Sequence, residues 1–207
     1  MKIGEFSRGG VARGQKSVRA ADHDMHPEAV LAPAGILEVD SDQLNVVFGT
    51  SRDTSDFVAD CLELWWTNRR AVHPGVRRLL IDLDNGPEIA SSRTQFMKRL
   101  VEFSDRHHLT LELAYYPPYH SKYNPIERCW GILENHWNGA LLTSVKTALE
   151  WAKTMTWRGV APLVHLLDRV YETGVRLSPR LFLPIAARLE RSALLPKWSL
   201  VIHPEPG

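Results

Sequence analysis

The spacing of apolar and polar residues predicts several short strands in the first part of the chain. Residues 1–6, 35–39 and 43–49 each have the composition of a strand, and the turn-forming residues 40–42 favour a hairpin between the last two. Residues 109–116 are another apolar run of strand length, which leads into a loop rich in proline. We therefore expect a sheet in this part of the protein.

The segment RRLLIDLDNGPE, residues 77–88, predicts a central strand that ends in a turn. Apolar residues at positions 79, 81 and 83 share one face, whereas Asp82 and Asp84 lie on the other. The Asn-Gly pair that follows is a turn signal. Asp84 therefore stands at the end of a strand, where an acid is most often a turn former and less often a metal ligand.

Several later segments have the apolar period of amphipathic helices. The expected helices are residues 54–69, a helix opened by the capping box Ser92-Arg93-Thr94-Gln95, a helix with an apolar face from Val145 to Met155, and residues 162–173, which end at Gly174.

A further helix begins inside the stretch YYPPYHSKYNPIERCWG, residues 115–131. Asn124 is a good N-cap, Pro125 suits the first helical position, and Glu127 falls at the third, which is close to a capping box. These residues alone favour helix capping for Glu127 and leave a catalytic role open.

Strands come first along the chain, and strands then alternate with helices. This order predicts an α/β (α+β mixed) fold, with a mixed sheet flanked by helices. The 207 residues suit one medium-sized domain, which we place at residues 1–175. Residues 176–207 are punctuated by proline and are expected to form a C-terminal extension.

Composition and charge narrow the possible functions. A hydrophobic content of 44% and a charged content of 24% are typical of globular proteins, and a net charge of +1 excludes a strongly basic nucleic-acid binder. A local basic patch remains near the N-terminus, where Arg8, Arg13 and Lys16 are among five cations that face a single acid. These cations belong either to a solvated arm or to a surface that contacts phosphate.

The sequence also indicates the cellular compartment. Cys61 and Cys129 sit in apolar helical patterns, as buried thiols of a reducing compartment do. The N-terminal residues lack the apolar segment of a signal peptide, and no apolar run is long enough to cross a membrane. We therefore expect a cytoplasmic protein that is not bound to a membrane.

Asp84 and Glu127 could form one site. The 42 residues between them are enough for a helix, a strand and a loop, so both carboxylates could meet at one end of the sheet. Such carboxylates repel each other unless a cation neutralises them, and oxygen ligands suit Mg²⁺ or Mn²⁺. Two such ions can support phosphoryl transfer.

The segments DNGPE and PPYHSKYNPIERCWG together resemble the second and third acidic motifs of the DDE transposases. The chain is similar in particular to the Rhodopirellula-type and related insertion-sequence transposases, whose counterparts of KIGEFSRGG, DHDMHP and TSDFVADCLELWW extend the resemblance over residues 1–175. The resemblance implies a ribonuclease-H-like fold, with Asp84 as the second metal-binding acid and Glu127 as the third. Asp82 shares the face of Asp84, but Asp84 carries the Asn-Gly of the family pattern.

The family reaction is metal-dependent. Two Mg²⁺ (or Mn²⁺) ions are expected in a complete enzyme. Water attacks a phosphodiester at the end of the element, and the freed 3′-hydroxyl then attacks target DNA. The implied partners are therefore DNA, both element ends and target, and further copies of the chain in a homo-oligomer. In such a bacterial setting, we expect the protein to be associated with the nucleoid.

The first acid of the family pattern normally lies on a strand before the KIGEFSRGG segment, and here that segment begins at Lys2, directly after Met1. We therefore expect the first strand to be missing and the catalytic domain to be truncated, with a chain that is inactive or nearly so by itself. The cluster of Asp22, Asp24 and His26 is a weak substitute, and Asp40 is weaker still. Two alternatives stay open: a non-catalytic remnant that binds DNA or a full-length transposase as an inhibitor, and a nuclease of the same fold.

Three residues near the acidic motifs are candidates for DNA contact. Arg93 lies close to the start of the helix after the DNGPE turn, and His120 and Lys122 lie in the proline loop before Glu127. Small solvated loops are the alternative explanation for all three.

Overall fold

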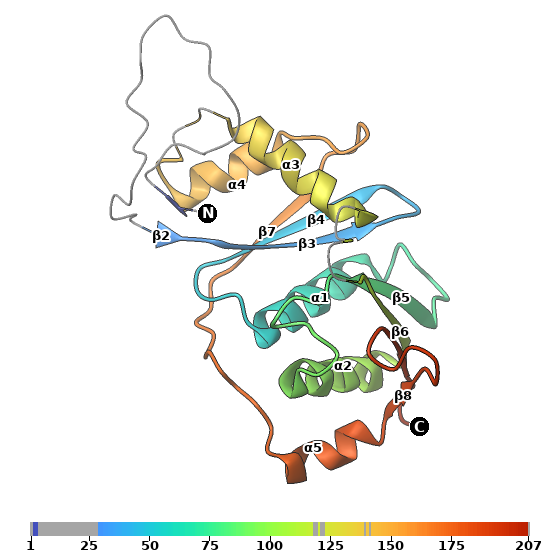
Figure 1. Ribbon diagram of the computed structural model, residues 1–207. Coiled ribbons are helices and arrows are strands. Elements are labelled where there is room, and N and C mark those ends of the chain that lie inside the picture. The colour runs from blue at the N-terminus through green and yellow to red at the C-terminus, as the bar shows by residue number, and fades with distance from the viewer. Residues whose placement is uncertain are drawn as a thin grey trace, which may run out of the picture. The chain divides into compact units, whose positions relative to one another are not determined.

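The computed structural model describes residues 2–3, 29–117, 120, 123–138, 140 and 142–206 (Figure 1). The chain divides into two compact units. Unit 1 contains residues 1–52 and 125–170, and unit 2 contains residues 53–124 and 171–207. The fold is mixed α/β, as the sequence predicts.

Unit 1 is built on a three-stranded sheet with the order β3-β4-β7. Strands β3 (Ala32–Glu38) and β4 (Gln43–Gly49) are antiparallel, and Asp42 adopts a φ of 54° in the turn between them. This pair is the predicted hairpin. Strand β7 (Leu163–Leu167) adds to the other side of β4 in parallel.

The prediction of a helix over residues 162–173 is wrong, because β7 occupies its first part. A short apolar run fits a strand and a buried helical segment equally well, and periodicity alone does not separate them. Pairing with β4 decides the matter here. The one polar residue of β7, His165, is half-buried, and burial lowers its pKa.

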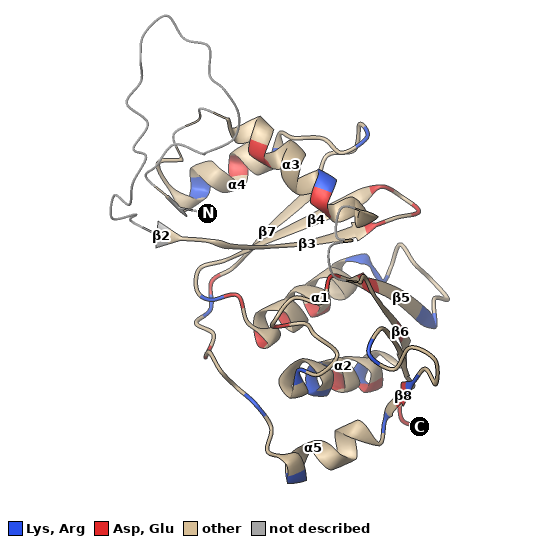
Figure 2. Cartoon of the chain, viewed as in Figure 1, with Lys and Arg blue, Asp and Glu red and all other residues tan. Residues whose placement is uncertain are grey.

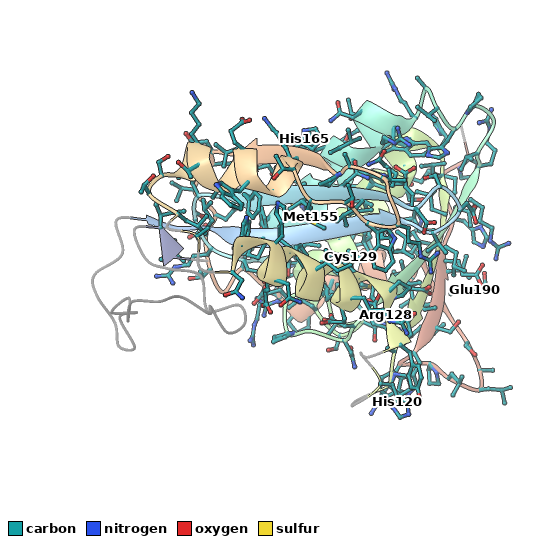
Figure 3. All side chains as sticks on the ribbon, turned by 90° about the horizontal axis from the view of Figure 1, so that it is seen from above. His120, Arg128, Cys129, Met155, His165 and Glu190 are labelled. Carbon is teal, nitrogen blue, oxygen red and sulfur yellow. The ribbon has the colours of Figure 1, made fainter. Side chains whose placement is uncertain are left out.

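Two helices cover one face of the sheet of unit 1. These are α3 (Pro125–Trp137) and α4 (Val145–Lys153), and Cys129 and Met155 lie in the core that they form with the sheet (Figure 3). Helix α3 approaches β3 closely at Gly35, where an added Cβ would lie 2.7 Å from the Trp130 ring. Glycine at this position therefore fixes how near the helix of Glu127 lies to the sheet.

The N-terminal residues of unit 1 are described only in part. Strand β1 (Lys2–Ile3) pairs antiparallel with β2 (Ala29–Val30), and Ile3 is buried in the core of the unit. The predicted strand over residues 1–6 is thus seen at these two positions.

Unit 2 contains a four-stranded sheet with the order β5-β6-β9-β8. Strands β5 (Arg78–Leu83) and β6 (Thr110–Tyr115) are parallel, as expected for two strands joined through a helix. The C-terminal residues, expected to be an extension, supply β8 (Leu189–Arg191) and β9 (Ser199–Ile202), and β9 pairs antiparallel with β6.

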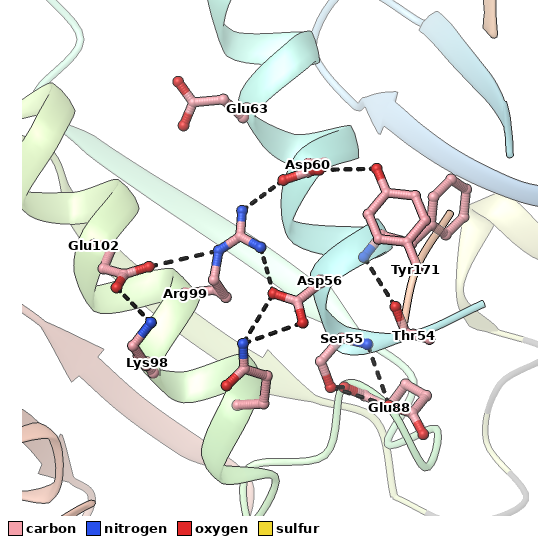
Figure 4. Close-up of polar contacts among 12 residues, drawn as sticks. Thr54, Ser55, Asp56, Asp60, Glu63, Glu88, Lys98, Arg99, Glu102 and Tyr171 are labelled. Carbon is pink, nitrogen blue, oxygen red and sulfur yellow. Dashed lines mark hydrogen bonds and ion pairs between the residues drawn. The ribbon is translucent and has the colours of Figure 1, made fainter. Parts of the chain in front are cut away.

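Three helices belong to unit 2: α1 (Ser55–Arg69), α2 (Thr94–His107) and the short α5 (Pro179–Ala186). A polar network joins α1 to α2, in which Arg99 forms ion pairs with both Asp56 and Asp60 (Figure 4). The predicted capping box at Ser92 is wrong: the N-cap of α2 is Arg93, which makes no side-chain capping bond.

The described residues form two mixed sheets, one in each unit. Within the described residues, β3, β4 and β7 form one sheet, and β5, β6, β9 and β8 form another. Each sheet is mixed, so the strand content and the parallel and antiparallel pairings fit a ribonuclease-H-like fold. Asp84 consequently belongs to unit 2, and Glu127 belongs to unit 1.

Candidate functional site

Asp84 directly follows the last residue of β5 and is held there by a tight turn. Its Oδ1 accepts a hydrogen bond from the backbone N–H of Gly86 at 3.1 Å. A Cβ on Gly86 would lie 3.2 Å from that same oxygen, which explains why glycine follows Asn85. The turn therefore orients the half-buried carboxylate, and among the described residues its second oxygen, Oδ2, has no hydrogen bond.

Two further acids lie near Asp84. Partial burial raises the pKa of the Asp53 carboxyl, and the negative charges of Glu88 and Asp84 raise it further. Asp53 is not among the residues predicted from the sequence, because an acid beside the N-cap of a helix has an ordinary structural explanation. Asp53 and Asp84 thus lie close enough for the charge of Asp84 to raise the pKa of the Asp53 carboxyl.

Arg93 neutralises one of these acids. Its Nη2 lies 2.9 Å and 3.0 Å from the two carboxylate oxygens of Glu88, and Glu88 also accepts bonds from the N–H and hydroxyl of Ser55. The Arg93 side chain is only 12% exposed. This candidate for DNA contact is thus engaged inside unit 2, where it ties the start of α2 to the start of α1.

Asp82, the competing acid, has a different environment. It lies on the same strand face as Asp84 and is exposed, although partial burial of its carboxyl raises its pKa. The pKa of Tyr116 is raised by burial first and then by the Asp82 charge. No turn fixes the Asp82 carboxylate as the Gly86 N–H fixes that of Asp84.

The chain leaves β6 at the same end of the sheet at which Asp84 stands. The backbone N–H of Tyr116 donates to the Leu83 carbonyl at 2.9 Å, immediately before Asp84. Further along this loop, the rings of His120 and Tyr123 stack with centroids 5.9 Å apart, and Tyr123 is 59% exposed. His120 is thus at the surface, as expected for a DNA-contact candidate.

Some of the predicted residues lie outside the described residues. These are Arg8, Arg13, Lys16 and Lys122, together with the Asp22, Asp24 and His26 cluster.

Glu127 lies in the first turn of α3 and is exposed. An ionised acid in this position interacts favourably with the N-terminal end of the helix dipole. Asn124, just before the helix, is 8% exposed, and Arg128 beside Glu127 is at the surface (Figure 3). The helix therefore presents Glu127 to solvent, where a metal ion or substrate could reach it.

No cluster of three or more His, Cys, Asp or Glu side chains that could hold a metal ion occurs within the part of the chain that the structure describes. The described residues therefore do not form a metal site that is made of side chains alone. A site with one or two carboxylates, completed by water and substrate phosphate, is the arrangement that Mg²⁺ commonly uses.

The model of the Rhodopirellula transposase DDE domain family matches residues 1–204. The chain belongs to this family of DDE transposases. The match confirms the resemblance drawn from the acidic motifs and extends it past residue 175, so that it includes β8 and β9. DDE transposase domains generally use divalent metal ions, and a transposase has DNA as its partner.

No curated protein and no solved structure matches the chain. In the part of this transposase domain that the structure describes, no helix is long and apolar enough to cross a membrane.

Proposed function

We propose that Asp84 and Glu127 are the second and third metal-binding acids of this DDE domain, whose family cleaves and joins DNA strands in transposition. The observation that carries the proposal is the turn at the end of β5. It fixes one oxygen of Asp84 on the Gly86 N–H and leaves Oδ2 without a hydrogen bond among the described residues. A capping or turn-forming role needs one oxygen only, so the second is available to a ligand.

The way the chain connects β6 to α3 supports a metal site shared by Asp84 and Glu127. Asp84 follows β5, and the loop toward Glu127 starts at the end of β6, its parallel neighbour. Neighbouring strands lie about 4.8 Å apart, so the two segments start from almost the same place. Nine residues, 116–124, then lead to the first residue of α3. This loop is long enough to return Glu127 toward Asp84.

The donor atoms fit the metal that the family uses. Two carboxylates supply hard oxygen ligands, and Mg²⁺ or Mn²⁺ would complete its coordination with water and DNA phosphate. Bound there, the ions would supply charge neutralisation and activation of the attacking oxygen. The two acids would orient these ions, Asp84 through its turn and Glu127 through the helix N-terminus.

The proposed reaction has two stages, both on DNA. Water first attacks a phosphodiester at the element end, and the freed 3′-hydroxyl then attacks target DNA. We further propose that this chain by itself is inactive or nearly so, because the family reaction uses three acids that act as a unit and only two are identified here. It would act in the cytoplasm, at the nucleoid, as a homo-oligomer on paired element ends.

A second candidate function is binding without catalysis. A domain that retains DNA-binding surfaces without a complete metal site would bind DNA or a full-length transposase and inhibit transposition. Product analysis separates the candidates. An active transposase yields joined strands, a nuclease of this fold yields cut strands only, and an inhibitor yields neither while it retains salt-dependent DNA binding.

Metal binding by the full chain tests the assignment of the acids without requiring activity. Mn²⁺ should broaden the backbone amide resonances around both residue 84 and residue 127. Asp84→Asn and Glu127→Gln should each remove this broadening. The matched controls are Asp82→Asn on the same strand face and Glu134→Gln on the exposed side of α3. Broadening that survives in Asp84→Asn and disappears in Asp82→Asn would transfer the ligand role to Asp82.

A further inference from the structure

One segment of unit 2 is strongly basic, although the chain as a whole is not. Residues 64–81 contain four arginines and one histidine but no acid, whereas the net charge of the whole chain is only +1. The arginines are Arg69, Arg70, Arg77 and Arg78. We name residues 69–78 the arginine turn.

The arginine turn connects the end of α1 to the start of β5, and its backbone is well anchored. The N–H of Val72 donates to the Arg69 carbonyl at 2.8 Å, and the N–H of His73 donates to the Arg70 carbonyl at 3.2 Å. The carbonyl of Arg77 accepts from the N–H of Thr110 at 2.9 Å, which ties the turn to β6. Figure 2 shows Lys and Arg colouring at the end of α1 and the start of β5. The arginine side chains therefore project from a fixed backbone.

Intramolecular partners account for only part of this charge. Arg78 pairs with Glu112 at 2.6 Å, in a surface pair whose side chains are 61% and 37% exposed. Arg69 and Arg70 also end α1, where cations favour the helix dipole. Arg77 has neither role among the described residues: it is exposed, and its Nη1 donates to the carbonyl of the neighbouring Val76 at 3.1 Å. Arg70 and Arg77 thus each present an exposed guanidinium group to solvent.

Guanidinium groups match one class of ligand particularly well. Each presents five N–H donors in a planar fork that fits the oxygens of a phosphate. Exposed guanidinium groups on an anchored loop suit a polyanion, and a DNA duplex presents closely spaced phosphates.

The arginine turn lies far from Asp84. Arg78 begins β5 and Asp84 follows its end, so six residue steps at about 3.3 Å per residue separate them by about 20 Å. That span corresponds to about six base pairs of duplex at 3.4 Å each. The turn is therefore outside the reach of the phosphodiester that Asp84 would hold.

We propose that the arginine turn binds the phosphate backbone of duplex DNA at a place separate from the two metal-binding acids. The proposal rests on the proposed function in one respect, that DNA is the polyanion this domain meets. It deepens that function, because it adds a contact that holds the duplex several base pairs away from the reacting phosphodiester.

Salt-dependent binding of a fluorescent DNA duplex to the full chain tests this, with EDTA present so that bound metal does not contribute. Arg70→Gln/Arg77→Gln should weaken binding and reduce the slope of log K against log salt by about 1.8, since each phosphate contact contributes about 0.9. The matched control is Arg176→Gln/Arg180→Gln, which removes two exposed arginines of the same unit outside the turn and should leave the slope unchanged. Arg70→Lys/Arg77→Lys keeps the charge and should retain most of the slope.

Three results would overturn the proposal. The first is an unchanged slope in Arg70→Gln/Arg77→Gln with an intact circular dichroism melt. The second is an equal loss in the control, which would mean that overall charge alone matters. The third is loss of heparin binding with duplex binding retained, which would assign the surface to another polyanion. The metal-binding test of Asp84 and Glu127 is separate, so failure there with a reduced slope here would contradict only the catalytic assignment.

Discussion

The two candidate acids are positioned by different means. Asp84 is fixed by a turn of three residues, in which the Gly86 N–H holds one carboxylate oxygen. Glu127 has no such local turn, and its position depends on where α3 lies. That helix is set by packing of Trp130 and Ile126 against Gly35 of β3, a contact between residues far apart in the sequence.

The difference shows how each acid could lose its function. A change near Asp84 should alter the direction of one carboxylate and leave the fold intact. A change near Glu127 should move a whole helix and cost stability as well. The two acids also belong to different units, so a substitution that destabilises one unit should displace the acid of that unit.

The largest expected effect is a loss of stability in unit 2, which contains Asp84. Arg99 is 21% exposed and pairs with both Asp56 and Asp60, so Arg99→Ala would leave two largely buried carboxylates without their cation. We expect a loss of about 3 kcal/mol in the free energy of unfolding of that unit. Urea denaturation followed by circular dichroism measures it. Lys98→Ala, which removes a surface pair with Glu102, should cost only about 0.5 kcal/mol. Equal effects of the two changes would contradict a structural role for the Arg99 network.

A smaller loss of stability should follow a substitution where β3 contacts α3, the helix that carries Glu127. The Cβ of Gly35→Ala would lie 2.7 Å from the Trp130 ring and 2.9 Å from Ile126, so α3 must shift. We expect a cost of about 2 kcal/mol, as in other overpacked sites, together with weaker Mn²⁺ binding. The control is Gly131→Ala in the same helix, where nothing lies within 4 Å of the new Cβ. It should be neutral or stabilising by about 0.5–1 kcal/mol. If Gly35→Ala were as well tolerated, the close approach of α3 to β3 would not set the position of Glu127.

The turn at Asp84 should respond mainly in metal affinity. A Cβ at Gly86 would lie 3.2 Å from Asp84 Oδ1, so Gly86→Ala should displace the carboxylate by a few tenths of an ångström. Loss of an outer hydrogen bond to a ligand commonly weakens metal binding by roughly tenfold or more. We expect that loss in a Mn²⁺ titration, with little change in the unfolding midpoint. A large loss of stability with unchanged affinity would show that the turn serves the fold alone.

The smallest effect concerns Asp53 and pH. Its pKa is raised from 3.8 in the folded protein by burial, then by Glu88 and Asp84. The folded state therefore binds this proton more tightly than the unfolded state, and the associated stability falls as pH rises from near 3.8 through the folded pKa. Asp53→Asn should remove this loss of stability. The melting temperature of the variant should therefore exceed that of the wild type by more at pH 7 than at pH 3.5. Parallel melting curves at both pH values would contradict the coupling.

Local signals in the sequence predicted the strand before Asp84 and the helix of Glu127, but the predicted central position of that strand is wrong, because within the described residues β5 lies at the edge of its sheet. The turn residues after Asp84 and the alternation along β5 are both determined by neighbours within a few residues. The DDE resemblance then assigned roles to Asp84 and Glu127 that turn and capping signals alone leave open. The family match over residues 1–204 confirms that resemblance.

Features that depend on distant pairing were not predicted. Strand β7 looks like a helix in isolation and becomes a strand by pairing with β4, which lies more than a hundred residues earlier. The C-terminal strands enter the sheet of unit 2 through β9 and β6 in the same way. The proximity of Asp53 to Asp84 also arises from tertiary structure, since a helix and a strand separate them in the sequence. Patterns within a short window do not contain this information.

The central claim is that Asp84 and Glu127 hold the same metal ion. Iron-directed cleavage tests it most directly: Fe²⁺ replaces Mg²⁺ on the full chain, and ascorbate with peroxide generates hydroxyl radicals that cut the backbone close to the bound ion. Gel electrophoresis and mass spectrometry then locate the cuts.

We expect two cuts, one near residue 84 and one near residue 127, both suppressed by excess Mg²⁺. Asp84→Asn and Glu127→Gln should each abolish both cuts, whereas Asp82→Asn should retain them. A single cut, or variants that each lose only the cut beside the substituted residue, would show that the two acids do not share an ion.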